Sequence, residues 1–206
     1  MLAAGLASSM AQSNVYSLNV VGYVNKVMPS GGKYIMISNP LNTTSNTINS
    51  LLSGAAVGSQ FLKFSGGGFQ TVSSKLPGAW TIDYTLNLGE GGFFRTPSAS
   101  TVDYTNTFVG EVLQGDSTNN WPAGYSIIAY PEPLGGDVNA LGLTTKLAAG
   151  DQVLQFDAVA QTYVIRTVLN PAGGVYSGPT PVVNVAESFF VRAATAGFWS
   201  RNFTVQ

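Results

Sequence analysis

The chain contains no cysteine and no histidine among its 206 residues. Without cysteine there are no disulfides, so stability has to come from buried side chains and backbone hydrogen bonds. The same absences exclude a Ser-His-Asp triad, a cysteine nucleophile and the usual zinc sites, which need histidine or cysteine ligands. The composition therefore argues against the commonest hydrolase and metal chemistries.

Charge is scarce as well. Asp, Glu, Lys and Arg make up 9% of the residues, against roughly 25% in a typical soluble domain, and the net charge is −1. No basic cluster is present that would bind nucleic acid or an anionic membrane surface. No apolar run approaches the ~20 residues of a membrane-spanning helix. A surface so poor in charge tolerates self-association better than a typical one.

A strand-like phrase recurs three times, at residues 16–24, 104–112 and 199–205. Each copy begins with an aromatic residue and has a large apolar residue four positions later, and the first two copies share Val-Gly-x-Val. Such self-similarity indicates repeated structural units.

The segments between these copies also match each other in order. The matched pairs are residues 28–41 with 121–134, 47–51 with 137–141, 58–64 with 150–156, and 90–95 with 187–192. We therefore expect two similar tandem domains, residues 13–112 and 113–206. Short runs rich in Val, Ile, Phe, Tyr and Thr, separated by Gly, Pro and Asn, predict an all-β fold. Two antiparallel β-sandwich or barrel-like domains from an internal duplication fit this pattern.

The first residues are small and apolar, and Ser9-Met10-Ala11 has the small-x-small pattern that precedes signal-peptidase cleavage. Residues 1–12 are interpreted as a signal-peptide remnant, with an N-terminal tail as the alternative. The first interpretation predicts an extracellular or cell-surface location.

The first copy of the phrase is apolar on both faces, whereas a strand on a half-solvated sheet alternates apolar and polar residues. Continuous apolarity predicts cover on both sides, by the same domain or by a neighbouring copy. The candidate self-assembly strand consists of Tyr16, Leu18, Val20, Val21, Gly22, Tyr23 and Val24. Gly22 and its counterpart Gly110 lie inside strands, where glycine marks a bulge or a close approach by another backbone.

Ten acidic residues leave a paired-carboxylate hydrolase open. Glu90 and Glu187 occupy matched positions, where they would form an acid/base pair or would cap turns and pair with Arg95 and Arg192. An acid/base pair needs two carboxylates with different roles, so duplicated copies favour the structural interpretation.

A calcium site is the second possibility for these acids. Asp137, Asp151 and Asp157 would be its ligands, but they lack the dense oxygen spacing of a calcium loop. We therefore predict no catalytic residue, no metal and no cofactor, and no enzymatic activity.

Aromatic residues are the better candidates for ligand contact. Trp121 and Trp199 lie at repeat landmarks, which favours core positions. Trp80 has no counterpart in the second half, so it is the candidate for an exposed platform that stacks on sugar rings.

Several of these phrases resemble a known group of proteins. Residues 11–25 and 38–42, together with the phrases at 89–94 and 108–112, resemble exported, β-rich, largely uncharacterised tandem-repeat proteins of environmental, verrucomicrobial-type bacteria. The resemblance implies export and tandem β domains, and it carries no catalytic residues.

Two functions follow as hypotheses. The first is a non-enzymatic structural subunit of an extracellular filament or surface layer, which assembles with itself head to tail through residues 13–27. The second is a secreted carbohydrate-binding or adhesive module that contacts cell-surface polysaccharide through Trp80. Low charge, tandem domains and the apolar N-terminal strand favour the first.

Overall fold

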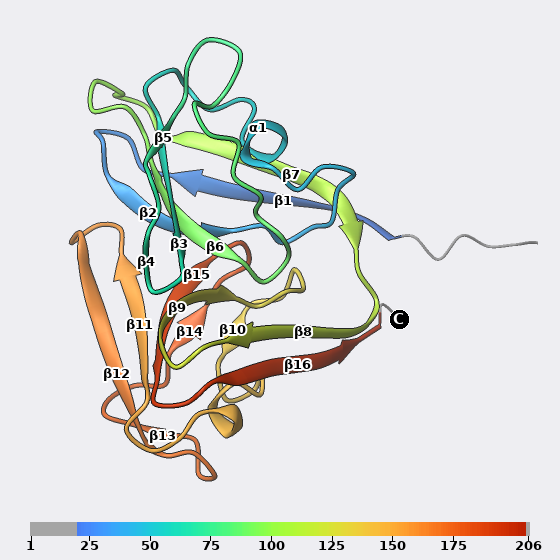
Figure 1. Ribbon diagram of the computed structural model, residues 1–206, viewed down its shortest axis with the longest axis vertical. Coiled ribbons are helices and arrows are strands. Elements are labelled where there is room, and N and C mark those ends of the chain that lie inside the picture. Colours follow the sequence, from blue (N-terminus) through green and yellow to red (C-terminus); the bar gives the residue numbers. More distant parts are fainter. Residues whose placement is uncertain (1–19, 205–206) are drawn as a thin grey trace, which may run out of the picture.

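A computed structural model describes residues 20–204 of the chain (Figure 1). Within this range the protein is built from short strands in antiparallel pairs, with one helix of four residues and one 3-10 turn. The all-β fold predicted from the sequence is confirmed.

The first half has two layers. A ribbon pairs its first strand with its last, and a larger sheet has the order β2-β6-β3-β4, with β5 beside β3. The elements are β1 (Val20–Met28), β2 (Tyr34–Ser38), α1 (Ile48–Leu51), β3 (Gln60–Ser65), β4 (Gly68–Phe69), β5 (Ser73–Ser74), β6 (Gly91–Arg95) and β7 (Tyr104–Val112).

The second half repeats this arrangement. Its ribbon is β8–β16, its larger sheet has the order β13-β12-β11-β15-β9, and β10 pairs with β14. The elements are β8 (Gly115–Trp121), β9 (Gly124–Ala129), β10 (Gly136–Asp137), η1 (Thr144–Lys146), β11 (Gln152–Asp157), β12 (Thr162–Asn170), β13 (Val175–Tyr176), β14 (Val182–Val183), β15 (Ser188–Ala193) and β16 (Gly197–Phe203).

The order of pairing is the same in both halves. In each half the first and last strands form the ribbon, β1 with β7 and β8 with β16. The second strand, β2 or β9, pairs with β6 or β15. That strand pairs on its other side with β3 or β11. A duplication as the origin of this order stays a prediction, as does the domain boundary between residues 112 and 113.

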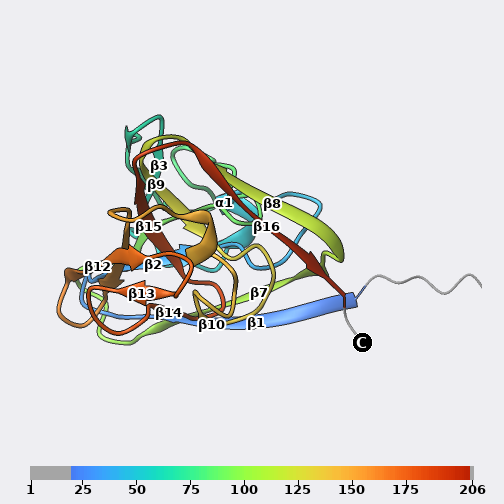
Figure 2. The same cartoon turned by 90° about the horizontal axis from the view of Figure 1, so that it is seen from below.

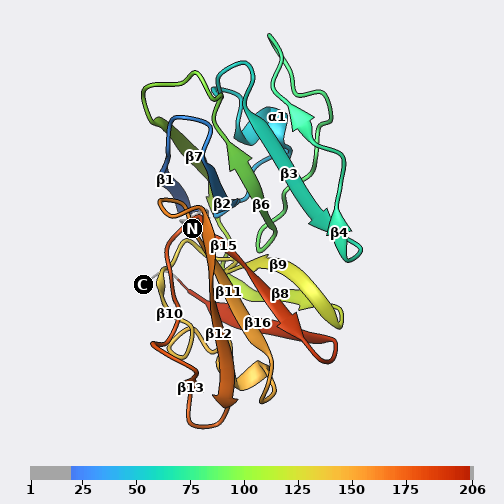
Figure 3. The same ribbon diagram turned by 90° about the vertical axis from the view of Figure 1, so that its left-hand side faces the viewer.

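Buried side chains form three clusters, because neighbouring residues of a strand point to opposite faces of its sheet. One cluster fills the space between each ribbon and its larger sheet, and the third lies where the two larger sheets meet. Figure 3 shows these two sheets one above the other. In the first half, Phe61 and Phe94 face the ribbon core. Phe93, next to Phe94 in β6, faces the cluster shared by both halves.

Reciprocal hydrogen bonds join the two halves. The Ser38 amide donates to the Ala186 carbonyl at 3.2 Å, and the Ala129 amide donates to the Gly89 carbonyl at 2.8 Å. Ser38 and Ala129 end matching strands, β2 and β9, so each half is bonded to the other through the same position.

Candidate functional site

The β1–β7 ribbon contains most of the predicted assembly strand. β1 pairs with β7 along its whole length, from Val20 opposite Val112 to Met28 opposite Tyr104. Residues 20–24 therefore form a strand within their own chain. Tyr16, Leu18 and the predicted signal remnant at residues 1–12 lie outside the described residues.

The predicted close approach of another backbone is confirmed at Gly110. A Cβ atom there would lie 2.4 Å from the Asn42 carbonyl oxygen, and one on Gly22 would lie 2.8 Å from a methyl carbon of Leu41. Asn42 and Glu111 exchange two backbone hydrogen bonds of 2.9 and 2.7 Å. The two glycines thus make room for residues 41–42 to cross the inner face of the ribbon.

One face of the ribbon is covered and the other is open. Val20, Val24 and Met28 pack toward the core of the first half. The exposed apolar side chains on the outer face are Val21 (59%), Tyr23 (73%), Val27 (54%) and Val109 (45%). The chain therefore does not itself cover both faces: within residues 20–204 the burial of β1 alternates. Cover by a neighbouring copy, the other predicted alternative, stays a prediction.

β1 also forms an edge. Among the described residues it pairs with β7 alone, so the backbone groups on its other side have no strand partner there, and Figure 2 shows β1 along one border of the molecule. Lys26 is its single charged residue and lies on the inner face. Burial lowers the pKa of the Lys26 amine, and the charge of Glu187 raises it by a smaller amount. The outer face therefore receives no charge from β1.

The matching ribbon of the second half has a different outer face. Its outward side chains are Asp116, Thr118, Asn120, Phe198, Ser200 and Asn202. Phe198 is the one apolar member, and the Lys146 Nζ atom lies 5.4 Å from the centre of its ring. The outer face of β1–β7 also carries Asn25, Thr105, Thr107 and Glu111. Polar outward residues are the ordinary pattern for a solvated sheet, so the four exposed apolar side chains among them are particular to the first half.

Trp80 does not form an exposed platform. Its side chain is 4% exposed and belongs to the core of the first half, with its ring against Phe94 and Lys75. The prediction of Trp80 as a sugar-stacking surface is therefore wrong.

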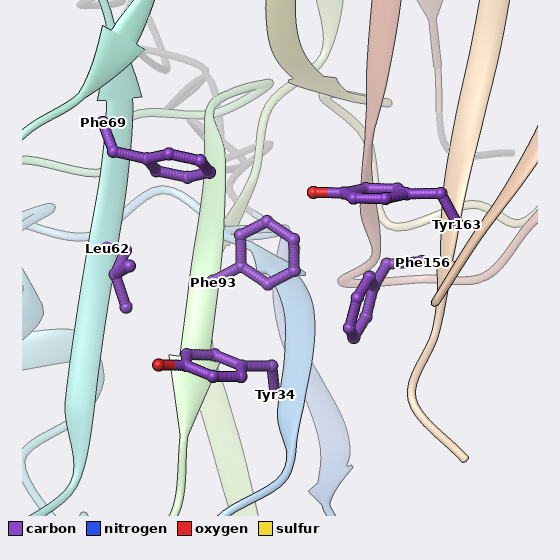
Figure 4. Close-up of a pocket in the computed structure, with 6 residues that line it drawn as sticks. All are labelled: Tyr34, Leu62, Phe69, Phe93, Phe156 and Tyr163. Carbon is purple, nitrogen blue, oxygen red and sulfur yellow. The ribbon is translucent and has the colours of Figure 1, made fainter. Parts of the chain in front are cut away.

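A cleft lined by aromatic rings lies where the two larger sheets meet. Its volume is about 200 Å³, and its lining side chains are Tyr34, Leu62, Phe69, Phe93, Phe156 and Tyr163. Figure 4 shows Phe93 between Phe69 and Tyr34, with Phe156 and Tyr163 reaching toward it from the second half. Phe93 and Phe156 meet edge to face at 5.0 Å between ring centres. Burial raises the pKa of the Tyr163 hydroxyl above its ordinary value of 10.0.

In each half an arginine of the larger sheet stacks on a tyrosine, and the first of these tyrosines, Tyr34, lines the cleft. The Arg95 guanidinium lies 5.4 Å from the Tyr34 ring centre and donates to Gln60 at 3.2 Å. In the second half, Arg192 lies 5.8 Å from the Tyr125 ring centre and donates to Gln152 at 3.5 Å. The two sheets therefore present similar tyrosine–arginine pairs.

Sequence reasoning missed this cleft. The available signal was the Phe93-Phe94 pair and its counterpart Phe189-Phe190. Adjacent residues of a strand point to opposite faces, so each pair requires an aromatic residue on both sides of its sheet.

The matched glutamates cap turns, as the structural interpretation expects, but their partners differ from those predicted. Glu90 accepts from the Asn87 amide at 2.9 Å and pairs with Lys63 at 3.1 Å, while Glu187 accepts from Asn184. Arg95 and Arg192 bond to the glutamines described above. The predicted Glu–Arg pairs are therefore wrong.

The three aspartates considered for calcium also bond to backbone amides. Asp137 accepts from Ala140, Asp157 accepts from Val159 and Ala160, and Asp151 accepts from Ala148 and Ala194. Across residues 20–204, no group of three or more acidic side chains lies together in a way that would hold a metal ion.

The described part of the chain has no helix with the length and apolarity that crossing a membrane requires. Neither a protein-family model, nor a curated protein, nor a solved structure matches the chain.

Proposed function

We propose that the protein is a non-enzymatic structural subunit of an extracellular filament or surface layer, which self-assembles head to tail through its N-terminal strand. The observation that carries this proposal is the β1–β7 ribbon, whose outer face exposes four apolar side chains and whose outer edge is unpaired among the described residues. An unpaired strand edge is a template for pairing with another chain.

The register of the ribbon supports a role for residues 13–19. Val20 already lies opposite Val112, the last residue of β7. A strand that continued upstream of Val20 would therefore extend past the end of β7. We propose that residues 13–19 add to a sheet edge of a neighbouring copy and bury Tyr16 and Leu18 there, because strand addition supplies backbone hydrogen bonds and side-chain pockets together.

The composition fits such an assembly. With 9% charged residues and a net charge of −1, copies repel each other weakly. Two tandem domains from a duplication, which the shared pairing order and the two tyrosine–arginine pairs support, would give a subunit with distinct ends. A contact between different surfaces of two copies leaves one of each surface free and therefore propagates.

A secreted carbohydrate-binding or adhesive module is the second candidate. The burial of Trp80 removes its proposed platform, and the half-exposed Tyr125 and Tyr163 remain for stacking. Sugar sites also need well-placed polar groups. The cleft beside Tyr163 is lined by apolar and aromatic side chains, whereas Tyr125 lies in a hollow with Glu90, Asn119 and Asn120. Self-assembly is preferred because it also accounts for the exposed apolar side chains and the unpaired edge of the β1–β7 ribbon.

Deletion of residues 13–19 tests the main proposal and leaves β1 whole. Negative-stain microscopy and light scattering of the purified wild-type protein should show fibres or sheets, and the deletion variant should remain small. Identical assemblies from both proteins would reject the strand-addition step, and a wild-type protein that stays monomeric at high concentration would reject self-assembly.

A further inference from the structure

We infer that the aromatic cleft is the socket for the outer face of the β1–β7 ribbon of a second copy of this chain, with Tyr23 as the side chain that enters it. This inference rests on the proposed self-assembly and names the surfaces that meet. It assigns a partner to the cleft and a role to Tyr23 separate from strand addition by residues 13–19.

Tyr23 is suited to this role by its position. It lies in the middle of the outer face, opposite Val109 and two residues from Val21, and its side chain is 73% exposed. Tyrosine combines a large apolar ring with a polar tip, which is why it is enriched at interfaces. Its apolar neighbours would exclude water around the inserted ring.

The cleft has the size and lining for one such ring. Its volume is about 200 Å³, and an apolar cavity of about 150 Å³ holds a benzene ring. Phe69 and Tyr163 stand half-exposed at its sides, while Phe93 is 5% exposed. An entering ring would meet other rings edge to face, the arrangement already present between Phe93 and Phe156 and one that stabilises aromatic pairs.

The two surfaces point in opposite directions from the first half. In β2 and β6, Ile35, Ile37 and Phe94 face the ribbon, whereas Tyr34 and Phe93 face the cleft. The larger sheet and the ribbon core therefore separate the cleft from the outer face of β1–β7. A molecule that uses both surfaces contacts two different neighbours, which gives the open, head-to-tail contact that builds fibres.

Charge near the two surfaces is complementary. Glu111 lies on the outer face opposite Val21, and the Arg95 guanidinium lies over the Tyr34 ring at the cleft. An acidic residue near Tyr23 and a basic residue at the cleft favour contact between these two surfaces. Contact between two outer faces would instead bring the Glu111 side chains of two copies together.

Two variants with complementary defects test the inference. Tyr23→Ser removes the entering ring and leaves the cleft intact. Tyr163→Glu places a charge at the cleft and leaves Tyr23 in place. Each alone should raise the protein concentration needed for assembly by about tenfold or more, the effect expected for a central interface aromatic. An equimolar mixture should form 1:1 dimers that do not grow, as measured by analytical ultracentrifugation.

Matched controls separate this result from loss of folding. Phe198→Ser removes an exposed aromatic from the matching ribbon, and Leu76→Glu adds a charge at an exposed turn of the first half; both should assemble like the wild type. Phe69→Glu provides a second socket variant if Tyr163→Glu proves unstable in urea unfolding.

The remaining outcomes each overturn the inference. If socket variants assemble normally while Tyr23→Ser does not, Tyr23 binds elsewhere. If all of these variants assemble but the 13–19 deletion does not, the proposed function stands and the socket assignment fails. A monomeric wild type, retained on polysaccharide beads unless Tyr163 is changed, would assign the cleft to a sugar and reject both proposals.

Discussion

Gly22 and Gly110 lie directly opposite each other in the antiparallel β1–β7 pair. Each belongs to a copy of the same Val-Gly-x-Val phrase, so the phrase pairs with itself about its glycine. At this point neither strand carries a side chain, and the segment at Leu41 and Asn42 occupies the space. The repeated glycine is thus explained by a crossing loop.

The first prediction concerns Gly110→Ala. The new Cβ would lie 2.4 Å from the Asn42 carbonyl oxygen, a backbone atom held in place by the hydrogen bonds between Asn42 and Glu111. We expect the free energy of unfolding to fall by about 1–3 kcal/mol or more, the range for an overpacked site. Urea unfolding followed by circular dichroism measures this change.

Gly68→Ala is the control for that variant. Gly68 also lies in a strand, and a Cβ there would meet no atom within 4 Å. Its stability should stay within about 0.5 kcal/mol of the wild type, as for most surface substitutions. Equal losses in the two variants would mean that the loss at Gly110 does not come from contact with Asn42.

The second prediction concerns Trp80, which is buried against Phe94. Trp80→Ala should lower the free energy of unfolding by about 3–5 kcal/mol, since it empties a large core volume. Phe198→Ala, at an exposed aromatic, should change it by less than about 1 kcal/mol. A stable Trp80→Ala protein that had lost binding to polysaccharide would restore the platform hypothesis.

The third prediction is a pH dependence that arises from Glu132. This side chain is 4% exposed, and burial raises the pKa of its carboxyl above the ordinary 4.5, although the Ser117 hydroxyl donates to it. The folded protein therefore holds this proton more tightly than the unfolded chain. Its contribution to stability is complete below pH 4.5 and is lost as the pH rises through the folded pKa.

Thermal unfolding between pH 4.5 and 7 measures the effect. The melting temperature of Glu132→Gln should depend less on pH over this interval than that of the wild type. Asp103 and Asp157 have lowered pKa values through hydrogen bonds from backbone amides, so their contributions are lost only below about pH 3.8 and leave this window unaffected. Parallel curves for the two proteins would show that another group titrates.

Some parts of the fold were predictable because they depend on local pattern. Alternation and β-branched residues indicate most strands, and the glycine inside a strand indicates the crossing at Gly110. β8 has no such pattern, because Gly-Asp-Ser-Thr-Asn-Asn-Trp has low strand propensity. It is a strand through its pairing with β16, a partner about 80 residues away that no local pattern reveals.

The errors at the candidate site have a related cause. Their spacing in the sequence predicted that Glu90 pairs with Arg95, but Glu90 forms its ion pair with Lys63 on the neighbouring β3. Trp80 was predicted to be exposed because it has no counterpart in the second half. The lack of a counterpart does not determine whether a side chain is buried. Which side chains make contact depends on how the sheets pack, and the local sequence pattern of each half does not determine that packing.

The last prediction concerns Gln161, which connects the halves at the edge of β2. Its side-chain oxygen accepts from the Tyr34 amide and its side-chain nitrogen donates to the Tyr34 carbonyl, both at 2.9 Å. Gln161→Ala removes both bonds. The Tyr34 amide should then exchange with solvent roughly fivefold faster or more, since a hydrogen bond contributes about 1 kcal/mol.

Hydrogen exchange followed by nuclear magnetic resonance resolves this change at single amides. Ile37 is the internal control: strand amides alternate in direction, and its amide faces β6 while those of Tyr34 and Ser38 face the second half. Its exchange should stay as in the wild type. Faster exchange at both positions would mean that Gln161 supports the whole sheet, and unchanged exchange at Tyr34 would show that the contact with Gln161 is not kept in solution.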